Sequence, residues 1–340
     1  MKSDTSNVID NNQQLLQLVG QRLQAGGLLE ARRLFHGRGL CYPEFDFFTV
    51  DWFTPALLFI FYKKPDESEL EKLRADIDEW FNLGVVGVAT VVLQHRWAKF
   101  VETIVLGDDL PSPHHVQENG LNYRVNLSAN QNIGLFLDAS TIRAWVRQNA
   151  ANKVVLNLFA YTCSFSVVAI AGGAEKVVNI DMSKGALSTG EINHALNKQD
   201  DDINEVHKSD SRGHSKNRKK PFFLSHNIFK SWGKLRKLGP YNLIIVDPPS
   251  YQPGSFVASK DYIKIVSKLT QLLQPEGLVI SVLNSPQLGF DFLREAYRNH
   301  APELEEIRVL APPKNFEEID ENKGLKVIIY RLRPIAHALQ

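Results

Sequence analysis

The sequence predicts a protein of the α/β class, with a doubly wound parallel sheet preceded by a small α+β domain. From residue 154 onward, short apolar runs rich in β-branched residues alternate with segments of helical periodicity. That alternation is typical of a parallel sheet covered by helices. Before residue 115, strand-like runs instead flank one amphipathic helix, which indicates a separate α+β domain.

Bulk composition sets the first limits. The chain has 340 residues, 44% of them hydrophobic, and a formal net charge of +1. This length is typical of roughly two or three domains. The near-neutral charge gives no global sign of nucleic-acid binding, so any such binding must come from a local patch. The only two cysteines, Cys41 and Cys163, lie far apart in the sequence, which argues against a disulfide framework or a Cys-rich zinc site.

The sequence also bears on location. Residues 1–14 are polar, and no apolar run approaches the ~20 residues needed to cross a bilayer. We therefore expect a cytoplasmic protein without a membrane partner. The histidines lack the spacing of metal ligands, so no metal site is expected.

We divide the chain into four parts. Residues 1–30 are a tail and a helix, 31–115 a small α+β domain on the substrate side, 116–140 a β-hairpin lead-in, and 141–340 the larger α/β domain. In the small domain, strands are expected at 45–52, 56–62 and 85–93, and a helix at 67–81. Thr54-Pro55 predicts a turn, and Asn119-Gly120 predicts the tight turn of the hairpin.

The α/β domain is expected to alternate strands and helices along the chain. The expected strands are 154–159, 176–181, 222–225, 241–247 and 277–283, closed by an antiparallel pair near 305–310 and 325–332. The expected helices are 141–148, 164–172, 184–196, 228–236, 260–273 and 288–299. Residues 198–220 are polar and predict a flexible insertion, whose basic end is either a solvated loop or an RNA contact.

The chain is organised around residues 154–181. An apolar strand is followed by small and hydroxyl residues, a helix, the pair Gly172-Gly173, and a second strand that ends on Asp181. Such a unit suits a nucleotide-like ligand, because the turn and helix start approach it closely and a carboxylate at the second strand accepts hydrogen bonds from ribose hydroxyls. Asp181 alone is equally consistent with a helix cap.

A second motif is Asp247-Pro248-Pro249-Ser250-Tyr251, which directly follows a buried strand and so lies at the carboxyl edge of the sheet. The prolines fix the backbone and leave carbonyls free to accept hydrogen bonds. Asp247 adds a carboxylate, and Tyr251 adds a ring that can stack on a base. Together they suit the holding of a flipped-out base. The alternative is that this segment is only a turn with no role in binding or catalysis.

These motifs resemble class I S-adenosylmethionine-dependent methyltransferases, and more narrowly the bacterial large-subunit ribosomal RNA methyltransferases of the RlmI and RlmK/RlmL type. The resemblance rests on residues 157–162, Gly172-Gly173-Ala174, Asp181 and residues 247–251, with 118–121 and 134–138 as the lead-in. Residues 33–37 and 50–51 resemble the preceding small domain. It covers roughly residues 30–335 and implies a Rossmann-like methyltransferase sheet.

The resemblance implies S-adenosylmethionine as cofactor, S-adenosylhomocysteine as product and RNA, in particular large-subunit ribosomal RNA, as partner. By position it implies a cofactor-binding set: Phe136, Asp138, Asn157, Phe159, Ala160, Tyr161, Thr162, Cys163, Ser164, Phe165, Ser166, Asp181, Met182, Asn227 and Ile228. Asp181 would bind the ribose, and Asn227 stands where the family has an acid near the adenine. The implied catalytic set is Asp247, Pro248, Pro249 and Tyr251.

The sequence departs from the family pattern at the cofactor loop. Cys163 and Ser164 stand where the family has glycine or alanine, so we expect a narrowed pocket or weakened cofactor affinity. Ala139 and Ser140 replace a basic contact. Cys163 itself is expected to fill space as a small apolar residue and not to act as a nucleophile.

The expected reaction is methylation of a base nitrogen, with guanine favoured. In-line transfer needs alignment more than acid–base power. Methylation of a cytosine carbon would need a cysteine nucleophile. The resembling proteins of that type carry one after the fifth strand, and residues 281–285, at the corresponding place, contain none. Two other functions stay open at this point: a non-catalytic protein of the same fold that binds RNA or a partner, and a methyltransferase for a protein or small molecule. The oligomeric state is also open.

Overall fold

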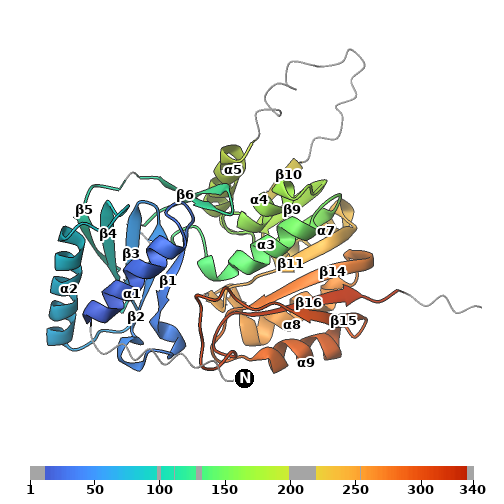
Figure 1. Ribbon diagram of the computed structural model, residues 1–340. Coiled ribbons are helices and arrows are strands. Elements are labelled where there is room, and N and C mark those ends of the chain that lie inside the picture. The colour runs from blue at the N-terminus through green and yellow to red at the C-terminus, as the bar shows by residue number, and fades with distance from the viewer. Residues whose placement is uncertain are drawn as a thin grey trace, which may run out of the picture. The chain divides into compact units, whose positions relative to one another are not determined.

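A computed structural model describes residues 12–97, 101–110, 112–127, 132–198, 220–252 and 254–334. The chain divides into two compact units (Figure 1). The first comprises residues 1–137 and 314–320, and the second residues 138–313 and 321–340.

The first unit contains a five-stranded sheet in the order β1-β2-β3-β4-β5. β3 and β4 are parallel, and the other neighbours are antiparallel. The strands are β1 Arg32–His36, β2 Phe48–Phe53, β3 Ala56–Phe61, β4 Thr90–His95 and β5 Glu102–Gly107. Therefore β1, β3 and β4 run in the same direction and end at the same edge of the sheet.

The core of this unit is aromatic. Every residue of β2 and β3 is buried. Helices α1 (Asn12–Ala25) and α2 (Glu67–Asn82) each contribute an apolar stripe to it, and Phe35, Phe48 and Phe59 pack ring against ring. Short 3-10 helices η1 (Gly37–Gly39) and η2 (Pro43–Phe45) link β1 to β2. The hairpin of β6 (His114–Glu118) and β7 (Leu121–Val125) turns at Asn119 and Gly120, both with positive φ, which confirms the predicted turn.

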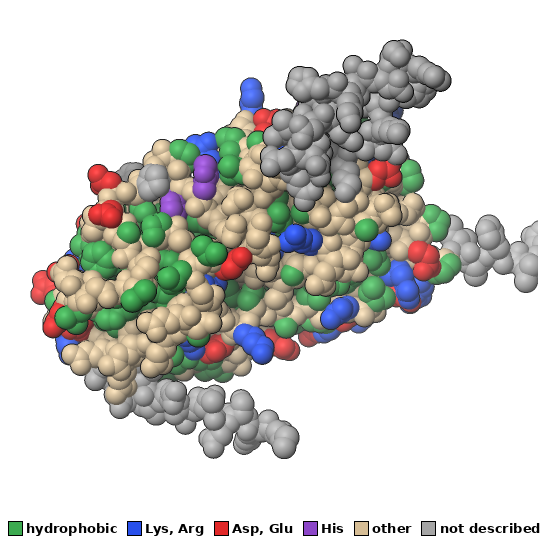
Figure 2. All heavy atoms as spheres, turned by 45° about the horizontal axis from the view of Figure 1, so that its top comes forward, with side chains coloured by type: hydrophobic (Ala, Val, Ile, Leu, Met, Phe, Trp, Pro, Cys, Tyr) green, Lys and Arg blue, Asp and Glu red, His purple; other side chains and the backbone are tan. Residues whose placement is uncertain are grey.

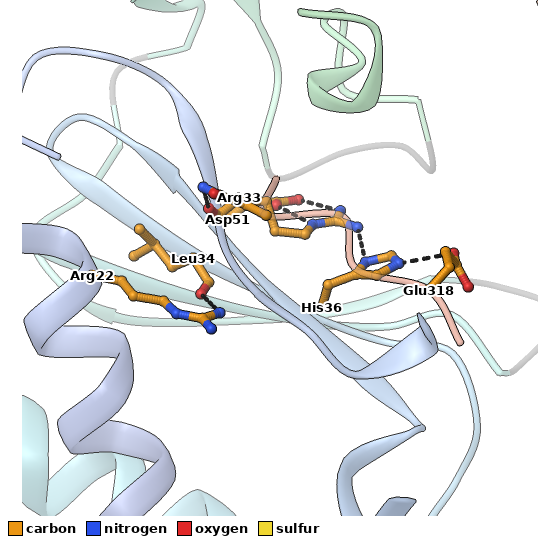
Figure 3. Close-up of polar contacts among 7 residues, drawn as sticks. Arg22, Arg33, Leu34, His36, Asp51 and Glu318 are labelled. Atoms are coloured by element: carbon orange, nitrogen blue, oxygen red, sulfur yellow. Dashed lines mark hydrogen bonds and ion pairs between the residues drawn. The ribbon is translucent and has the colours of Figure 1, made fainter. Parts of the chain in front are cut away.

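A series of polar contacts between buried side chains also stabilises this unit (Figure 3). Arg33 Nε and Nη2 donate to the two carboxylate oxygens of Asp51 at 2.7 and 2.9 Å. Nη1 of Arg33 lies 2.7 Å from Nδ1 of His36, and Nε2 of His36 lies 3.2 Å from Glu318. The Arg33 guanidinium also stacks on Phe316, 4.4 Å from the ring centroid. These contacts explain why residues 314–320, although distant in sequence, belong to the first unit.

The second unit contains a seven-stranded sheet in the order β10-β9-β8-β11-β14-β16-β15. The first five strands of that order are parallel, and β16 is antiparallel to both of its neighbours. The strands are β8 Val154–Leu158, β9 Lys176–Asp181, β10 Lys220–Ser225, β11 Tyr241–Val246, β14 Leu273–Leu283, β15 Leu304–Val309 and β16 Lys326–Leu332. The predicted doubly wound parallel sheet with an antiparallel end is confirmed.

Helices alternate with these strands. They are α3 Ser140–Asn149, α4 Ser164–Ala171, α5 Lys184–Leu196, α7 Trp232–Leu238, α8 Ala258–Leu269 and α9 Phe290–His300, with 3-10 helices η3 Leu137–Ala139 and η5 Ile228–Lys230. Leu156 and Leu158 of β8 join a core cluster with residues of α7, α8 and α9. Because side chains alternate along a strand, Asn157 between them points to the opposite face.

Some predicted elements differ from the structure. The apolar run 85–93 was expected to be a strand, but β4 begins at Thr90, because Gly84 and Gly87 take positive φ and turn the chain there. β5 was not expected, because it lies half-exposed at the sheet edge and its sequence has no clear alternation of polar and apolar residues. Helix 228–236 is instead η5 followed by α7, and helix 260–273 already ends at Leu269. Residues 199–219 of the predicted insertion lie outside the described residues.

Candidate active site

The adjacent strands β8 and β11 of the second unit end at a point where the chain leaves toward opposite edges of the sheet. From β8 the chain continues through α4 to β9, and from β11 it continues through α8 to β14 on the other side. Leu158 pairs with Val246, so the segments that follow, 159–163 and 247–251, leave the sheet side by side. In open α/β sheets, ligands bind outside the carboxyl ends of the strands at such a point.

The turn after β8 has an unusual backbone. Phe159, Tyr161 and Cys163 have φ angles of 56°, 47° and 62°, a conformation that costs a non-glycine residue of the order of 1–3 kcal/mol. The Ala160 N–H donates to Ile180 O at 3.1 Å, and the Cys163 N–H donates to Ala160 O at 2.7 Å. These hydrogen bonds hold the turn against the end of β9. The sequence predicted a close-approach loop here but not this strain.

Asp181, at the end of β9, fixes this turn through hydrogen bonds. One carboxylate oxygen accepts the Tyr161 N–H at 2.9 Å, and the other accepts the Ser183 N–H at 2.8 Å. The cap of α5 is provided by Ser183, whose hydroxyl accepts the Ala186 N–H. Each oxygen of Asp181 keeps a second lone pair, so the structural role leaves it able to accept further hydrogen bonds.

The side chain of Cys163 packs against helix α5. It is fully buried and packs with Ala160 and Leu187. A Cβ at Gly190 of α5 would lie 2.5 Å from its Sγ, so the missing side chain of Gly190 makes the space that Cys163 fills. Burial raises the pKa of the Cys163 thiol well above its usual value, with Asp181 and Glu191 acting in the same direction. It therefore stays a protonated thiol, as expected for a space-filling residue.

Beneath the turn lies a buried polar network that the sequence did not reveal. Asn157 Nδ2 donates to Asn179 Oδ1 at 2.9 Å, Asn179 Nδ2 donates to Ser166 Oγ at 2.9 Å, and His194 Nε2 lies 2.9 Å from the same hydroxyl. Burial lowers the pKa of His194 to about 4, so its ring is neutral at pH 7. Asn193 Nδ2 donates to Thr162 O at 2.9 Å. The side chains of Asn157 and Ser166 are thus engaged inside the protein and orient α4.

Asp247 follows β11 and is partly buried. Loss of hydration and, to a smaller extent, the Asp138 carboxylate raise its pKa to about 7, against the opposite effect of the Arg143 guanidinium. Arg143 lies on α3 and is almost fully buried, and no motif in the sequence marked it as a site residue. A carboxyl group poised near neutrality at a sheet edge is typical of a functional site.

Tyr251 is well exposed, with 66% of its surface accessible. It lies on β12 (Tyr251–Gln252), which pairs with β13 (Phe256–Val257) in a small antiparallel hairpin. The Ser250 hydroxyl donates to Asn284 O, and the Ala258 N–H donates to Ser250 O at 3.1 Å, so the chain on both sides of the tyrosine is anchored. Pro248 is buried and Pro249 half-buried.

Asn227 lies close to Asp181 through the pairing of β10 with β9. Ser225 pairs with Asp181, and the His226 N–H donates to Asp181 O at 3.0 Å. The Asn227 Oδ1 accepts the Phe229 N–H at 2.9 Å and caps η5. Its side-chain N–H groups have no acceptor among the described residues.

The remaining predicted site residues divide by burial. Ala160, Thr162, Phe165 and Ile228 are buried, whereas Met182 is 48% exposed. Phe159 packs its ring edge-on against Phe256. Phe136 is 46% exposed and belongs to the first unit.

No helix in the described residues is long and apolar enough to span a membrane. These residues contain no group of three or more His, Cys, Asp or Glu side chains placed to hold a metal ion.

Comparison with known proteins gives consistent results. The Bacillus subtilis protein YwbD, whose name places it among ribosomal RNA large subunit methyltransferases, is 28% identical over 312 residues, which are 88% of this chain and 74% of that protein. Ribosomal RNA large subunit methyltransferase K/L of Hahella chejuensis is 28% identical over 264 residues, 74% of this chain but 34% of that protein. This chain therefore matches about a third of the longer relative.

A solved S-adenosylmethionine-dependent methyltransferase from Streptococcus mutans has the same fold, with a TM-score of 0.76, 24% identity and coverage of 94% of this chain and 81% of that one. A family model described as S-adenosylmethionine-dependent methyltransferase matches residues 32–331. That range includes β1 of the first unit and extends into β16 of the second. The chain belongs to the S-adenosylmethionine-dependent methyltransferase family.

Proposed function

We propose that this enzyme methylates a base nitrogen of large-subunit ribosomal RNA, with guanine favoured, in the cytoplasm. The observation that carries the proposal is the Asp247–Tyr251 segment beside the strained turn after β8. A carboxyl group with a pKa of about 7 and an exposed tyrosine ring lie within four residues of each other. The names of the relatives support RNA as the substrate.

The second unit offers groups that fit the cofactor. The main chain of residues 159–163 would approach it, Asp181 would accept hydrogen bonds from its ribose hydroxyls, and Asn227 would contact its adenine. The spare lone pairs of Asp181 support its role, as do the side-chain N–H groups of Asn227, for which the described part of the chain offers no acceptor. Bound S-adenosylmethionine supplies a methyl group made electrophilic by its sulfonium.

Asp247 would act on the acceptor base. Its carboxylate accepts a hydrogen bond from the attacking amino group and takes up the proton that this nitrogen loses when the N–C bond forms. The carbonyl groups near Pro248 and Pro249 would accept the second amino hydrogen, and Tyr251 would stack on the base. These contacts orient the nitrogen lone pair for in-line attack.

The described residues do not support methylation of a cytosine carbon. That reaction needs a thiolate next to the base. Cys163 is a buried thiol, and Ser281, on β14, is buried with its hydroxyl against that of Tyr297. Cys41, which is exposed, belongs to the first unit.

Mass mapping of ribosomal RNA from a deletion strain tests the proposal. We expect one methylated nucleotide to disappear, and to return with the wild-type gene but not with Asp181→Ala. Asp291→Ala, which removes a carboxylate whose side chain is 95% exposed, is the control and should restore the methyl group fully. If the methylation map is unchanged although calorimetry shows S-adenosylmethionine binding, the substrate is a protein or a small molecule and not ribosomal RNA.

A further inference from the structure

The overall charge gives no guide to where RNA would bind. Figure 2 shows a face on which Lys and Arg side chains are interspersed with Asp and Glu. A local cluster of positive charge would therefore be needed to bind RNA.

Such a cluster lies at one edge of the sheet in the first unit. β1, β3 and β4 end at this edge, and the next residues along the chain are Arg38 in η1, Tyr62 after β3, and Arg96 with Trp97 after β4. The Arg96 N–H donates to Phe61 O at 2.8 Å, which extends the β3–β4 ladder and sets Tyr62 and Arg96 side by side.

The side chains at this edge are stacked. Arg38 Cζ lies 4.1 Å from the ring centroid of Tyr62, and Arg96 Cζ lies 5.9 Å from it. Arg96 also donates twice to Gln94 Oε1, at 3.1 and 2.7 Å. Arg38 is exposed, whereas Tyr62, Arg96 and Trp97 are half-buried. Both guanidinium groups are thus held by the tyrosine before any ligand binds, which lowers the entropy cost of binding.

The positive charge at this edge is only partly offset by acidic groups. Asp51 is the nearby carboxylate, and both of its oxygens are taken by Arg33 (Figure 3). Among the described residues, neither Arg38 nor Arg96 forms an ion pair with a carboxylate. Burial lowers the pKa of Arg96, and the charges of Arg33 and Arg38 lower it further, against the opposite effects of Tyr62 and Asp51. A bound anion would relieve this repulsion.

We propose that Arg38, Tyr62 and Arg96 form a binding site for the phosphodiester backbone of single-stranded RNA. Guanidinium groups bind phosphate oxygens through paired N–H donors, and unpaired bases stack on guanidinium planes and aromatic rings. Trp97, which already stacks on His95 at 4.4 Å, provides a further ring beside the arginines. The inference rests on RNA being the substrate and adds a second RNA contact, in the first unit.

The test measures binding of a fluorescein-labelled single-stranded RNA to the full chain by anisotropy over a range of salt concentrations. For Arg38→Gln/Arg96→Gln we expect about tenfold weaker binding and a plot of log affinity against log salt that is shallower by about 1.4, since each phosphate contact contributes about 0.7 on single strands. The control Lys72→Gln/Arg298→Gln removes two exposed charges elsewhere and should keep the wild-type slope.

Tyr62 provides an independent variant. Tyr62→Phe keeps the ring and should bind RNA like wild type, whereas Tyr62→Leu should weaken binding severalfold. Calorimetry with S-adenosylmethionine should give wild-type affinity for all variants, which shows that the second unit is intact. Wild-type RNA affinity and slope in the double arginine variant would overturn the site. Absence of RNA binding by the wild-type chain would overturn the proposed substrate as well.

Discussion

At the scale of single residues, Asp247 links structure to chemistry most directly. Its pKa of about 7 means that roughly half the molecules carry the carboxylate at neutral pH. Only the ionised form can accept the proton of an amino group. The deprotonated fraction grows as the pH rises, so the active fraction follows the same direction.

We therefore expect kcat/KM for RNA methylation to rise with pH and level off above about pH 7, falling tenfold per pH unit on the acid side. Asp247→Asn should lose this ionisation and reduce kcat/KM by about 100-fold or more. The measurement is single-turnover methylation between pH 5 and 9. A wild-type profile without an ionisation near neutrality would contradict this role.

Stability gives a second readout of the same group. Because the folded state holds the Asp247 proton more tightly than the unfolded chain, stability should fall as the pH rises from about 4 to 7. The slope from this group is at most about 1.4 kcal/mol per pH unit. Urea unfolding of Asp247→Asn should lack this contribution, which separates a raised pKa from general damage to the fold.

At the scale of elements, the turn after β8 and helix α5 are matched to each other. Cys163 takes a φ of 62° and buries its thiol against Gly190, and the glycine is the reason that α5 can pack so closely. The departure from the family pattern at Cys163 therefore goes together with a glycine on the neighbouring helix.

This fit predicts that Gly190→Ala changes the stability in opposite directions with and without the Cys163 side chain. Gly190→Ala alone should destabilise the protein by about 1–3 kcal/mol, because the new methyl group overlaps Cys163 Sγ. In a Cys163→Gly background the overlap is gone, and the same change should stabilise by up to about 1 kcal/mol through helix propensity. Urea unfolding of the four proteins in this double-mutant cycle gives the coupling energy.

Gly185, on the same helix, is the matched control because a Cβ there meets nothing within 4 Å. Gly185→Ala should be neutral or slightly stabilising in both backgrounds. Additive effects of the Cys163 and Gly190 changes would mean that the two residues do not share the space.

The sequence predicted most elements of the second unit because buried parallel strands and amphipathic helices leave clear periodic patterns. β9, for example, has the predicted bounds. Prediction was weaker in the first unit. The run 85–93 is apolar throughout, yet its first residues form a turn, and the half-exposed β5 has a mixed pattern. Local composition cannot show which apolar run pairs with a neighbour.

The same limit applies to the site. The motifs placed Asp181 and Asp247 at strand ends, because strand, turn and acid are contiguous in the sequence. The contacts of Asn179, Asn193 and His194 were not predicted, because each depends on a partner 13 to 31 residues away. The raised pKa of Asp247 depends on burial and on Asp138 and Arg143, none of which adjoins it in the sequence.

At the scale of the whole molecule, each unit has its own hydrophobic core. The core cluster of the first unit includes residues from α1, α2, η2 and β1 to β4. That of the second includes residues from its strands, η5, α7, α8 and α9. Because the cores are separate, we expect the two units to unfold separately. The exchange rate of each amide then reports on the unit to which that amide belongs.

A ligand held by the second unit should therefore protect that unit selectively. At a concentration 100 times its Kd, S-adenosylhomocysteine stabilises the state that binds it by about 2.7 kcal/mol. We expect exchange in β8, β9 and β11 to slow by up to about 100-fold in a hydrogen-exchange mass spectrometry experiment, while β2 and β3 keep their rates. Asp181→Ala should abolish the protection. Equal slowing in β2 and β3 would instead show that the two units open together, because only a shared cooperative transition carries ligand stabilisation into a core that does not bind the ligand.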